Sequence, residues 1–291
     1  MIIFLQLLVS GLMLGGLFAI VSIGLTLIFG IVRVVNFAHG EFLMLGMYGT
    51  YLGSTHFGVH PYWMAIGLVP IFFIAGAVIQ TFIIQPLLGA EYEHAQIFAT
   101  VGLSIALMNL ALLVFSANVY STPAYGVRHP LTIGPIQVLD GELTIFVCGL
   151  LLAIGLQMFL QKTHLGRAIR AVAQNRAAAA LMGININRIY AITFGIGTAC
   201  VGLAAVLVAP LYPVTPTVGI YFVLSAFVVV VLGGLGSLKG AFLGALIIGV
   251  VQSMSGFYLG AGLREIATFV IFIAILIFRP TGLFGLGRGS E

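Results

Sequence analysis

The residues best able to do chemistry in this sequence are an ionisable pair, His39 and Glu41, which lies between long apolar stretches. Side chains of these types could act as acid and base in an intramembrane enzyme, or the carboxylate could couple ion movement to the passage of a solute. Polar groups are costly in hydrocarbon, so they normally face a partner or a water-filled cavity. Together with Asn36 and Gly40, the pair predicts a segment that lines a pathway or its gate.

The same four residues also admit a structural interpretation. If a helix starts near Asn36, its side chain can accept hydrogen bonds from the free N–H groups of the first turn. Glu41 would then lie in that turn, where the positive end of the helix dipole favours a carboxylate. Both interpretations, helix cap and pathway, stay open on the sequence, and they can coexist.

A second group of candidate residues is cationic. The segment Lys162–Arg188 holds five of the eleven Lys and Arg residues, and no acidic residue occurs between Glu142 and Glu265. Because cations near the ends of spans resist translocation, residues 162–188 are predicted to be a cytoplasmic loop.

The internal pattern of this basic loop is more ordered than topology alone requires. Leu165, Ile169 and Val172 recur at helical spacing, with Arg167 and Arg170 on a neighbouring stripe. Gly183 predicts a helix stop, and Asn187 is a plausible cap for the next span. We interpret the loop as a platform for a cytoplasmic protein; a solvated amphipathic loop is the alternative. The predicted coupling residues are Leu165, Gly166, Arg167, Ile169, Arg170, Ala178, Ala179 and Gly183.

A glycine-rich segment at 233–240 superficially resembles a phosphate-binding loop. That loop needs Gly-Lys followed by Ser or Thr, whereas the order here is Lys239-Gly240-Ala241, so nucleotide binding by this chain is rejected. The segment instead predicts a break between helices and a face of small residues that lets backbones pack closely. The residues assigned to this role are Gly233, Gly234, Gly236, Ser237, Gly240 and Gly244.

Residues 239–243 also echo His39–Leu43 at an offset of 200, either by chance or because paired glycine-interrupted helices mark a central pathway.

The composition defines the elements that must position these residues. With 61% hydrophobic and 6% charged residues, the chain is predicted to be an all-α integral membrane protein, and a soluble basic face for nucleic acid is absent. Both cysteines fall in apolar runs, so neither a disulfide nor a metal site is predicted.

Nine apolar runs predict a polytopic bundle of about eight or nine spans within one domain, residues 1–291. Six runs are long (5–31, 61–85, 95–117, 143–161, 189–211 and 263–279) and three are broken by glycine (38–54, 219–235 and 240–258). Nine crossings place the N-terminus outside and the Arg279–Arg288 tail in the cytoplasm, although a re-entrant pair could replace two of them. Residues 118–142 then form an extracytoplasmic loop, whose turn formers predict a short hairpin that either connects two spans or receives a partner.

At these residues the chain resembles the permease subunits of ATP-binding-cassette importers for branched-chain amino acids, the LivH/LivM type, and most of all LivH. The resemblance is carried by Gly24-Leu25 to Phe29-Gly30, Asn36–Glu41, Gly166-Arg167-Ala168 to Gly183-Ile184-Asn185, Gly233–Ser237 and Arg279–Gly285. The basic loop is similar to the coupling motif of such permeases, usually written Glu-Ala-Ala, three residues, Gly. Ala178, Ala179 and Gly183 match, but Ala177 stands where Glu is common, which puts a salt bridge to the ATPase in doubt rather than the docking.

The resemblance implies a machine in the bacterial inner membrane. This chain would form half of a translocation pathway in the bilayer with a second permease subunit, either a copy or a different homologue. Two cytoplasmic ATPases would bind the ATP, so this chain would need no cofactor and would not itself be an enzyme. An extracytoplasmic binding protein would deliver the cargo. Related permeases carry urea or short amides, and the sequence does not separate these cargoes from amino acids. A stand-alone secondary transporter or channel is the chief competitor, with Glu41 and Glu265 as its only candidate coupling carboxylates.

Overall fold

The computed structural model describes residues 1–88, 95–279 and 281–284, so Pro280, Gly285 and the remainder of the basic tail, including Arg288, lie outside the described residues. The helices are α1 (Ile2–Val32), α2 (His39–Phe57), α3 (Ala65–Ile79), α4 (Ala95–Phe115), α5 (Asp140–Lys162), α6 (His164–Gln174), α7 (Arg176–Leu181), α8 (Ile186–Val208), α9 (Val218–Gly233), α10 (Leu238–Tyr258) and α11 (Arg264–Phe278). Short 3-10 turns occupy Pro61–Met64, Gln85–Leu87 and Ala261–Leu263, and a π turn, Gln80–Ile84, extends α3.

The predicted helical membrane protein is confirmed, and each of the nine apolar runs contains a helix. Six segments are long and apolar enough to cross a membrane: Ile2–Val32, Pro61–Leu87, Ala95–Phe115, Asp140–Lys162, Ile186–Val208 and Leu238–Tyr258. Helices α9 and α11 have 16 and 15 residues, fewer than the roughly 20 that span a bilayer upright. Crossings beyond the six stay a prediction.

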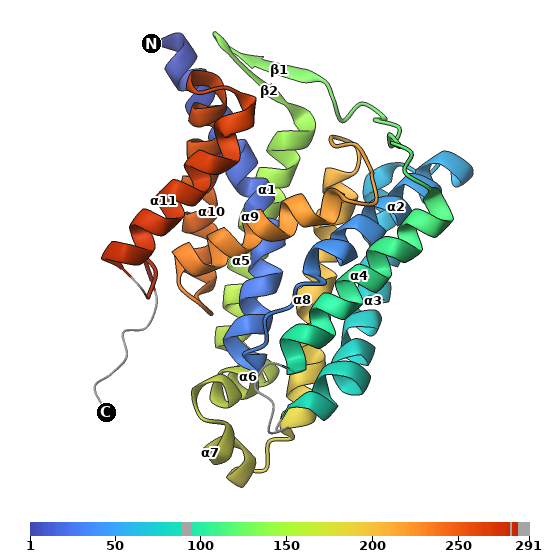
Figure 1. Ribbon diagram of the computed structural model, residues 1–291, viewed down its shortest axis with the longest axis vertical. Coiled ribbons are helices and arrows are strands. Elements are labelled where there is room, and N and C mark those ends of the chain that lie inside the picture. Colours follow the sequence, from blue (N-terminus) through green and yellow to red (C-terminus); the bar gives the residue numbers. More distant parts are fainter. Residues whose placement is uncertain (89–94, 280, 285–291) are drawn as a thin grey trace.

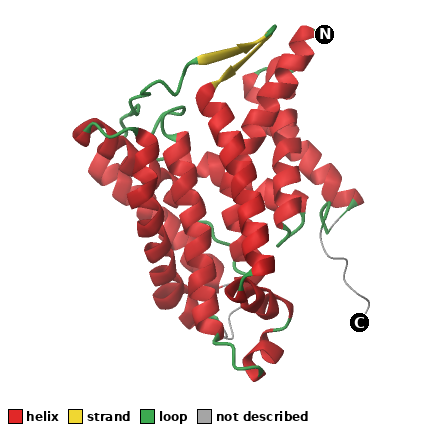
Figure 2. Ribbon diagram, turned by 180° about the vertical axis from the view of Figure 1, so that it is seen from behind, coloured by secondary structure: helices red, strands yellow, loops and turns green. Residues whose placement is uncertain are grey.

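The two ends of the bundle differ in structure. A hairpin of β1 (Pro130–Ile133) and β2 (Ile136–Leu139) lies at the same end as the N-terminus, with Leu131 opposite Val138. Helices α6 and α7 lie at the opposite end, as both views show (Figures 1 and 2). The hairpin matches the prediction because Gly134, with a φ of 62°, and Pro135 make the turn between the two short apolar runs.

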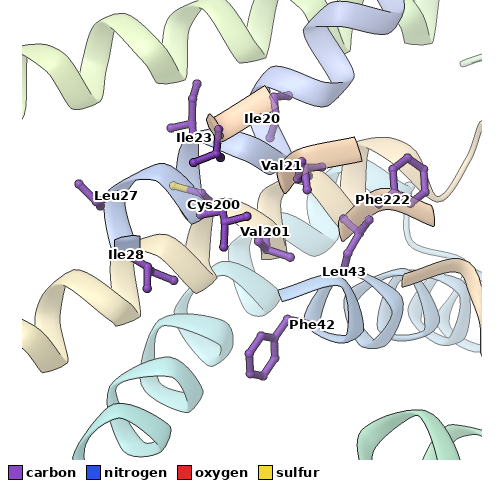
Figure 3. Packing of buried hydrophobic residues seen from close by; sticks show 14 of the residues in the cluster. Ile20, Val21, Ile23, Leu27, Ile28, Phe42, Leu43, Cys200, Val201 and Phe222 are labelled. Atoms are coloured by element: carbon purple, nitrogen blue, oxygen red, sulfur yellow. The ribbon is translucent and has the colours of Figure 1, made fainter. Parts of the chain in front are cut away.

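Helix α1 forms the centre of the bundle and packs most extensively against α10, and also against α8, α5 and α9. Its best apolar window is 83% buried, against 11% for α4, because α1 is apolar on every face and has neighbours all round. Figure 3 shows Ile20, Ile23 and Ile28 of α1 among buried residues of α8, α2 and α9. Gly11 and Gly15 lie directly against the α10 backbone near Gly249, the close approach that small residues permit in membranes.

Candidate functional site

The Asn36–Glu41 segment begins in the turn between α1 and α2. Helix α2 begins at His39, three residues after Asn36, because the Asn36 Oδ1 atom accepts a hydrogen bond from the Ala38 N–H at 3.1 Å and closes a turn ahead of the helix. Glu41 lies in the first turn of α2. Asn36 thus orders the approach to the helix rather than capping it directly.

The His39 side chain joins α2 to the central helix. It is fully buried, and its Nε2 atom lies 3.0 Å from the carbonyl oxygen of Val21 in α1. Because a carbonyl oxygen only accepts, the Nε2 atom carries the proton and donates this bond. The Nδ1 atom has no hydrogen-bond partner among the described residues. The imidazole is therefore held in one orientation between two helices.

Glu41 connects α2 to two further helices. Its Oε1 atom accepts a hydrogen bond from Ser104 Oγ of α4 at 3.1 Å. Its other carboxylate oxygen lies beside Gly219 of α9, where an added Cβ atom would be 2.8 Å from it. The carboxylate is 1% exposed, and the main cavities of the described chain are lined by other residues. In this conformation the segment is a packing junction, and its role in a pathway or gate stays a prediction.

The two echoing glycines, Gly40 and Gly240, have the same relation to α9. A Cβ atom at Gly40 would overlap the carbonyl oxygen of Gly219, and one at Gly240 would overlap that of Gly233. Both ends of α9 are therefore held by backbone contacts that only glycine permits. The break after α9 contains Gly234 and Gly236 at φ values of 101° and 86°, and the Ser237 hydroxyl accepts a hydrogen bond from Gly240 N–H to start α10. Gly236 also lies against Gly30 of α1, and Gly244 lies against the α9 backbone.

The basic loop folds into two short helices with side-chain caps. Thr163 Oγ1 accepts from Gly166 N–H at 2.9 Å to start α6, and Asn175 Oδ1 accepts from Ala178 N–H at 2.9 Å to start α7. Gly183, at a φ of 81°, ends the second helix. The predicted cap Asn187 is wrong: Asn185 caps α8 by accepting from Arg188 N–H, while Asn187 Oδ1 accepts from Gln85 Nε2 instead.

The faces of these helices separate by polarity. Gly166 lies against the last turn of α5, and Ile169 and Val172 are buried, whereas Arg167 and Arg170 are exposed. In α7, Ala179 is buried and Ala178 is exposed. A cavity of about 390 Å³ separates part of α6 from α1 and from the Gly236–Lys239 break.

Two residues at the tip of this loop escaped the sequence analysis. Leu181 and Met182 are 90% and 81% exposed at the end of α7, which projects from the bundle in Figure 1. Large apolar side chains exposed together are typical of interaction sites. The available signal was a pair of large apolar residues directly before the helix stop at Gly183. No metal-binding cluster of three or more His, Cys, Asp or Glu occurs within the described residues.

Comparison with known proteins places this arrangement in a family. Residues 7–278 match the family described as branched-chain amino acid transport system / permease component. The chain is 33% identical to the high-affinity branched-chain amino acid transport system permease protein BraD of Pseudomonas aeruginosa, over 97% of this chain and 96% of that one. It is 32% identical to LivH of Escherichia coli (strain K12), with the same coverage.

A solved structure shares the fold at low sequence identity. This is PsaBC from Streptococcus pneumoniae in complex with Fab, with a TM-score of 0.56 and 14% identity, covering 96% of this chain and 92% of that one. The sequence matches extend over nearly the whole length, through the α2 junction and the α6–α7 loop alike. The chain belongs to the family of permease components of branched-chain amino acid transport systems.

Proposed function

We propose that this chain is a membrane-spanning permease subunit of an ATP-binding-cassette importer for branched-chain amino acids. Two relatives that match over almost their entire length are permease proteins of high-affinity transport systems for these cargoes. The apolar helices and the family make the chain a multi-pass protein of the inner membrane. A pathway for hydrophobic amino acids needs few permanent charged contacts, which agrees with a chain in which only 6% of the residues are charged.

In this proposal the chain supplies half of the pathway and a second permease subunit supplies the other half. Two cytoplasmic ATPases bind and hydrolyse ATP, and an extracytoplasmic binding protein delivers the cargo to the end that carries the hairpin. The observation that carries the proposal is the shape of the α6–α7 loop: a capped helix pair that presents Leu181 and Met182 beyond the bundle.

The same loop provides a route from the ATPases to the spans. Arg170 of α6 and Lys239 at the start of α10 line one cavity, next to the backbone of the Gly236–Lys239 break. Because the cavity leaves α6 incompletely packed, a push on α6 can displace it toward this break without first disrupting a filled core. Motion of the docked ATPases would thereby reach α10 and, through Gly233, the end of α9.

A stand-alone carrier is less well supported. Its coupling carboxylate would have to exchange ions with a pathway, but Glu41 is buried against Ser104 and Gly219. Glu265 lines a cavity in the first turn of α11, but the positive end of the helix dipole already favours a carboxylate there, so its position does not require a coupling role.

The test is uptake into membrane vesicles that contain this chain together with its partner permease, ATPase and binding-protein subunits. Radiolabelled leucine and radiolabelled urea are compared, with and without ATP and vanadate. ATP-dependent, vanadate-sensitive leucine uptake is the expected result. Uptake of urea alone would support the ATP-binding-cassette importer but show that its cargo is urea rather than a branched-chain amino acid. Uptake of either compound without the ATPases would overturn the proposal in favour of a carrier or channel.

A further inference from the structure

A cavity of about 380 Å³ opens among α1, α5, α10 and the start of α11, near the end of the bundle that carries the hairpin. Its wall is mostly apolar and includes Leu14, Leu17, Ile145 and Phe257. The volume falls in the range of roughly 300–1,000 Å³ that is usual for small-molecule sites, and so does the combination of an apolar wall with a few polar groups.

Two opposite charges face this cavity. Glu142 comes from the first turn of α5 and Arg264 is the first residue of α11. Both side chains are half-buried, and no ion pair joins them within the described residues. The Nε atom of Arg264 is buried without a hydrogen-bond partner there, next to Gly256, where an added Cβ atom would lie 2.8 Å from it. The two charges are thus brought to one cavity and are not neutralised by each other.

The other polar groups of the cavity are largely occupied by the protein itself. Ser253 Oγ donates to the carbonyl oxygen of Leu7 at 2.8 Å, and Ser10 Oγ accepts from Gln6 Nε2 at 3.2 Å. Tyr212 also lines the cavity, but its hydroxyl is uncharged, so Glu142 and Arg264 are the two groups there that could pair with the charges of a ligand.

We propose that this cavity is an outer binding site for an α-amino acid zwitterion with an apolar side chain. A guanidinium group binds a carboxylate through parallel hydrogen bonds, and a carboxylate accepts from an ammonium group. Arg264 binds the carboxylate of the ligand, Glu142 binds its ammonium group, and the side chain lies on the apolar wall. The inference rests on the proposed function, because it assigns residues to the cargo named there.

The position of the cavity suits cargo arriving from outside. Gln6 of α1 bonds to both backbone groups of Gln137 in β2, and α5 begins directly after that strand. The hairpin is therefore fixed to two of the helices that form the cavity wall. A binding protein that contacts the hairpin would release its cargo beside Glu142.

The experiment measures equilibrium binding of radiolabelled leucine to the purified permease–ATPase complex without binding protein. Two truncated analogues are used as competitors: 3-methylbutylamine, which lacks the carboxylate, and 4-methylpentanoate, which lacks the ammonium group. We expect Arg264→Gln and Glu142→Gln each to weaken leucine binding by about tenfold or more, as loss of one partner of a hydrogen-bonded charge pair does. Arg264→Gln should leave binding of the amine unchanged, and Glu142→Gln should leave binding of the acid unchanged.

This pattern separates recognition from a structural role. If the two charges only hold α5 to α11, each substitution will weaken all three ligands alike or none, and the proposal is overturned. Glu265→Gln is the matched control, because this neighbouring carboxylate lines a different cavity and should leave all three affinities unchanged. Wild-type uptake of leucine without any leucine binding to the complex would also overturn the site while leaving the proposed function intact. Failure of wild-type leucine uptake would overturn the function itself.

Discussion

Gly40 and Gly219 meet at the crossing of α2 and α9, where a single methyl group decides whether the helices can approach. A Cβ atom at Gly40 would overlap the carbonyl oxygen of Gly219. Overpacking of this kind costs typically about 1–3 kcal/mol, so Gly40→Ala is expected to lower the melting temperature of the purified complex. Gly102→Ala is the control, because its Cβ atom would meet nothing within 4 Å. Equal melting temperatures for the two variants would contradict the assigned crossing.

A substitution at Glu41 can distinguish a role in helix packing from a role in the transport pathway. Glu41→Gln keeps an oxygen that can accept from Ser104 and removes the charge. If the segment is a packing junction, the variant should retain most of the ATP-dependent leucine uptake. Loss of uptake in a variant with wild-type melting behaviour would instead assign the carboxylate to the pathway. Ser104→Ala, which removes only the donor, provides the comparison.

At the scale of elements, a substitution at the tip of the α6–α7 loop should impair coupling to the ATPases without affecting the folding of this chain. Leu181 is 90% exposed, so Leu181→Ser removes little packing within this chain. We expect the substitution to reduce stimulation of ATPase activity by loaded binding protein, with expression and melting unchanged. Leu113→Ser in α4, where the side chain is 83% exposed, is the control, because it lies outside both the α6–α7 loop and the hairpin. Full stimulation in the Leu181 variant would rule out a docking role for the tip.

Gly183 makes a second, stronger prediction for the same loop. Its φ of 81° is a conformation that side chains other than glycine adopt at a cost, and its position is open. Gly183→Arg should therefore abolish ATPase stimulation by altering the end of α7, while membrane insertion stays normal. The measurement is stimulated turnover together with the amount of protein in the membrane fraction; normal turnover would refute the docking assignment.

The hairpin depends on one side chain from a distant element. Gln6 Nε2 donates to the carbonyl oxygen of Gln137 at 2.8 Å, and Gln6 Oε1 accepts from its N–H at 2.9 Å. Gln6→Ala should speed hydrogen exchange at the Gln137 amide, because each bond contributes about 0.5–1.5 kcal/mol. Gln137→Ala is a matched control, since both bonds involve its backbone and survive the change. Unaltered exchange in the Gln6 variant would show that the hairpin is held by other contacts.

For the whole molecule, the sequence predicts the elements better than their junctions. The apolar runs and the hairpin turn are local signals, so the helices and β1–β2 follow from them. The cap of α8 does not, because Asn185 and Asn187 are equally suitable and a contact with Gln85 decides between them. Exposure of Leu181 could not be predicted either, because a large apolar residue is ordinarily assigned to the interior.

The cavity that contains Glu142 and Arg264 could not be predicted from the sequence. Glu142 and Arg264 each appear as ordinary charges at the end of a span. Only the packing of α5, α10 and α11 around α1 brings them to one cavity. The buried positions of His39 and Glu41 follow the same rule: the polar types indicate a partner, but the fold alone shows that the partners are Val21 and Ser104.

The central position of α1 has a consequence for biogenesis. Translation produces α1 well before α10, yet the surface formed by Gly11 and Gly15 is closed by α10, which begins at Leu238. At about 5–20 residues per second, the intervening chain takes roughly 10–40 s to synthesise. During that interval α5 and α8 can already pack on α1, but the surface formed by Gly11 and Gly15 faces lipid or the insertion machinery. Premature termination before α10 therefore leaves an inserted bundle in which the Gly11–Gly15 surface of its central helix is unpacked.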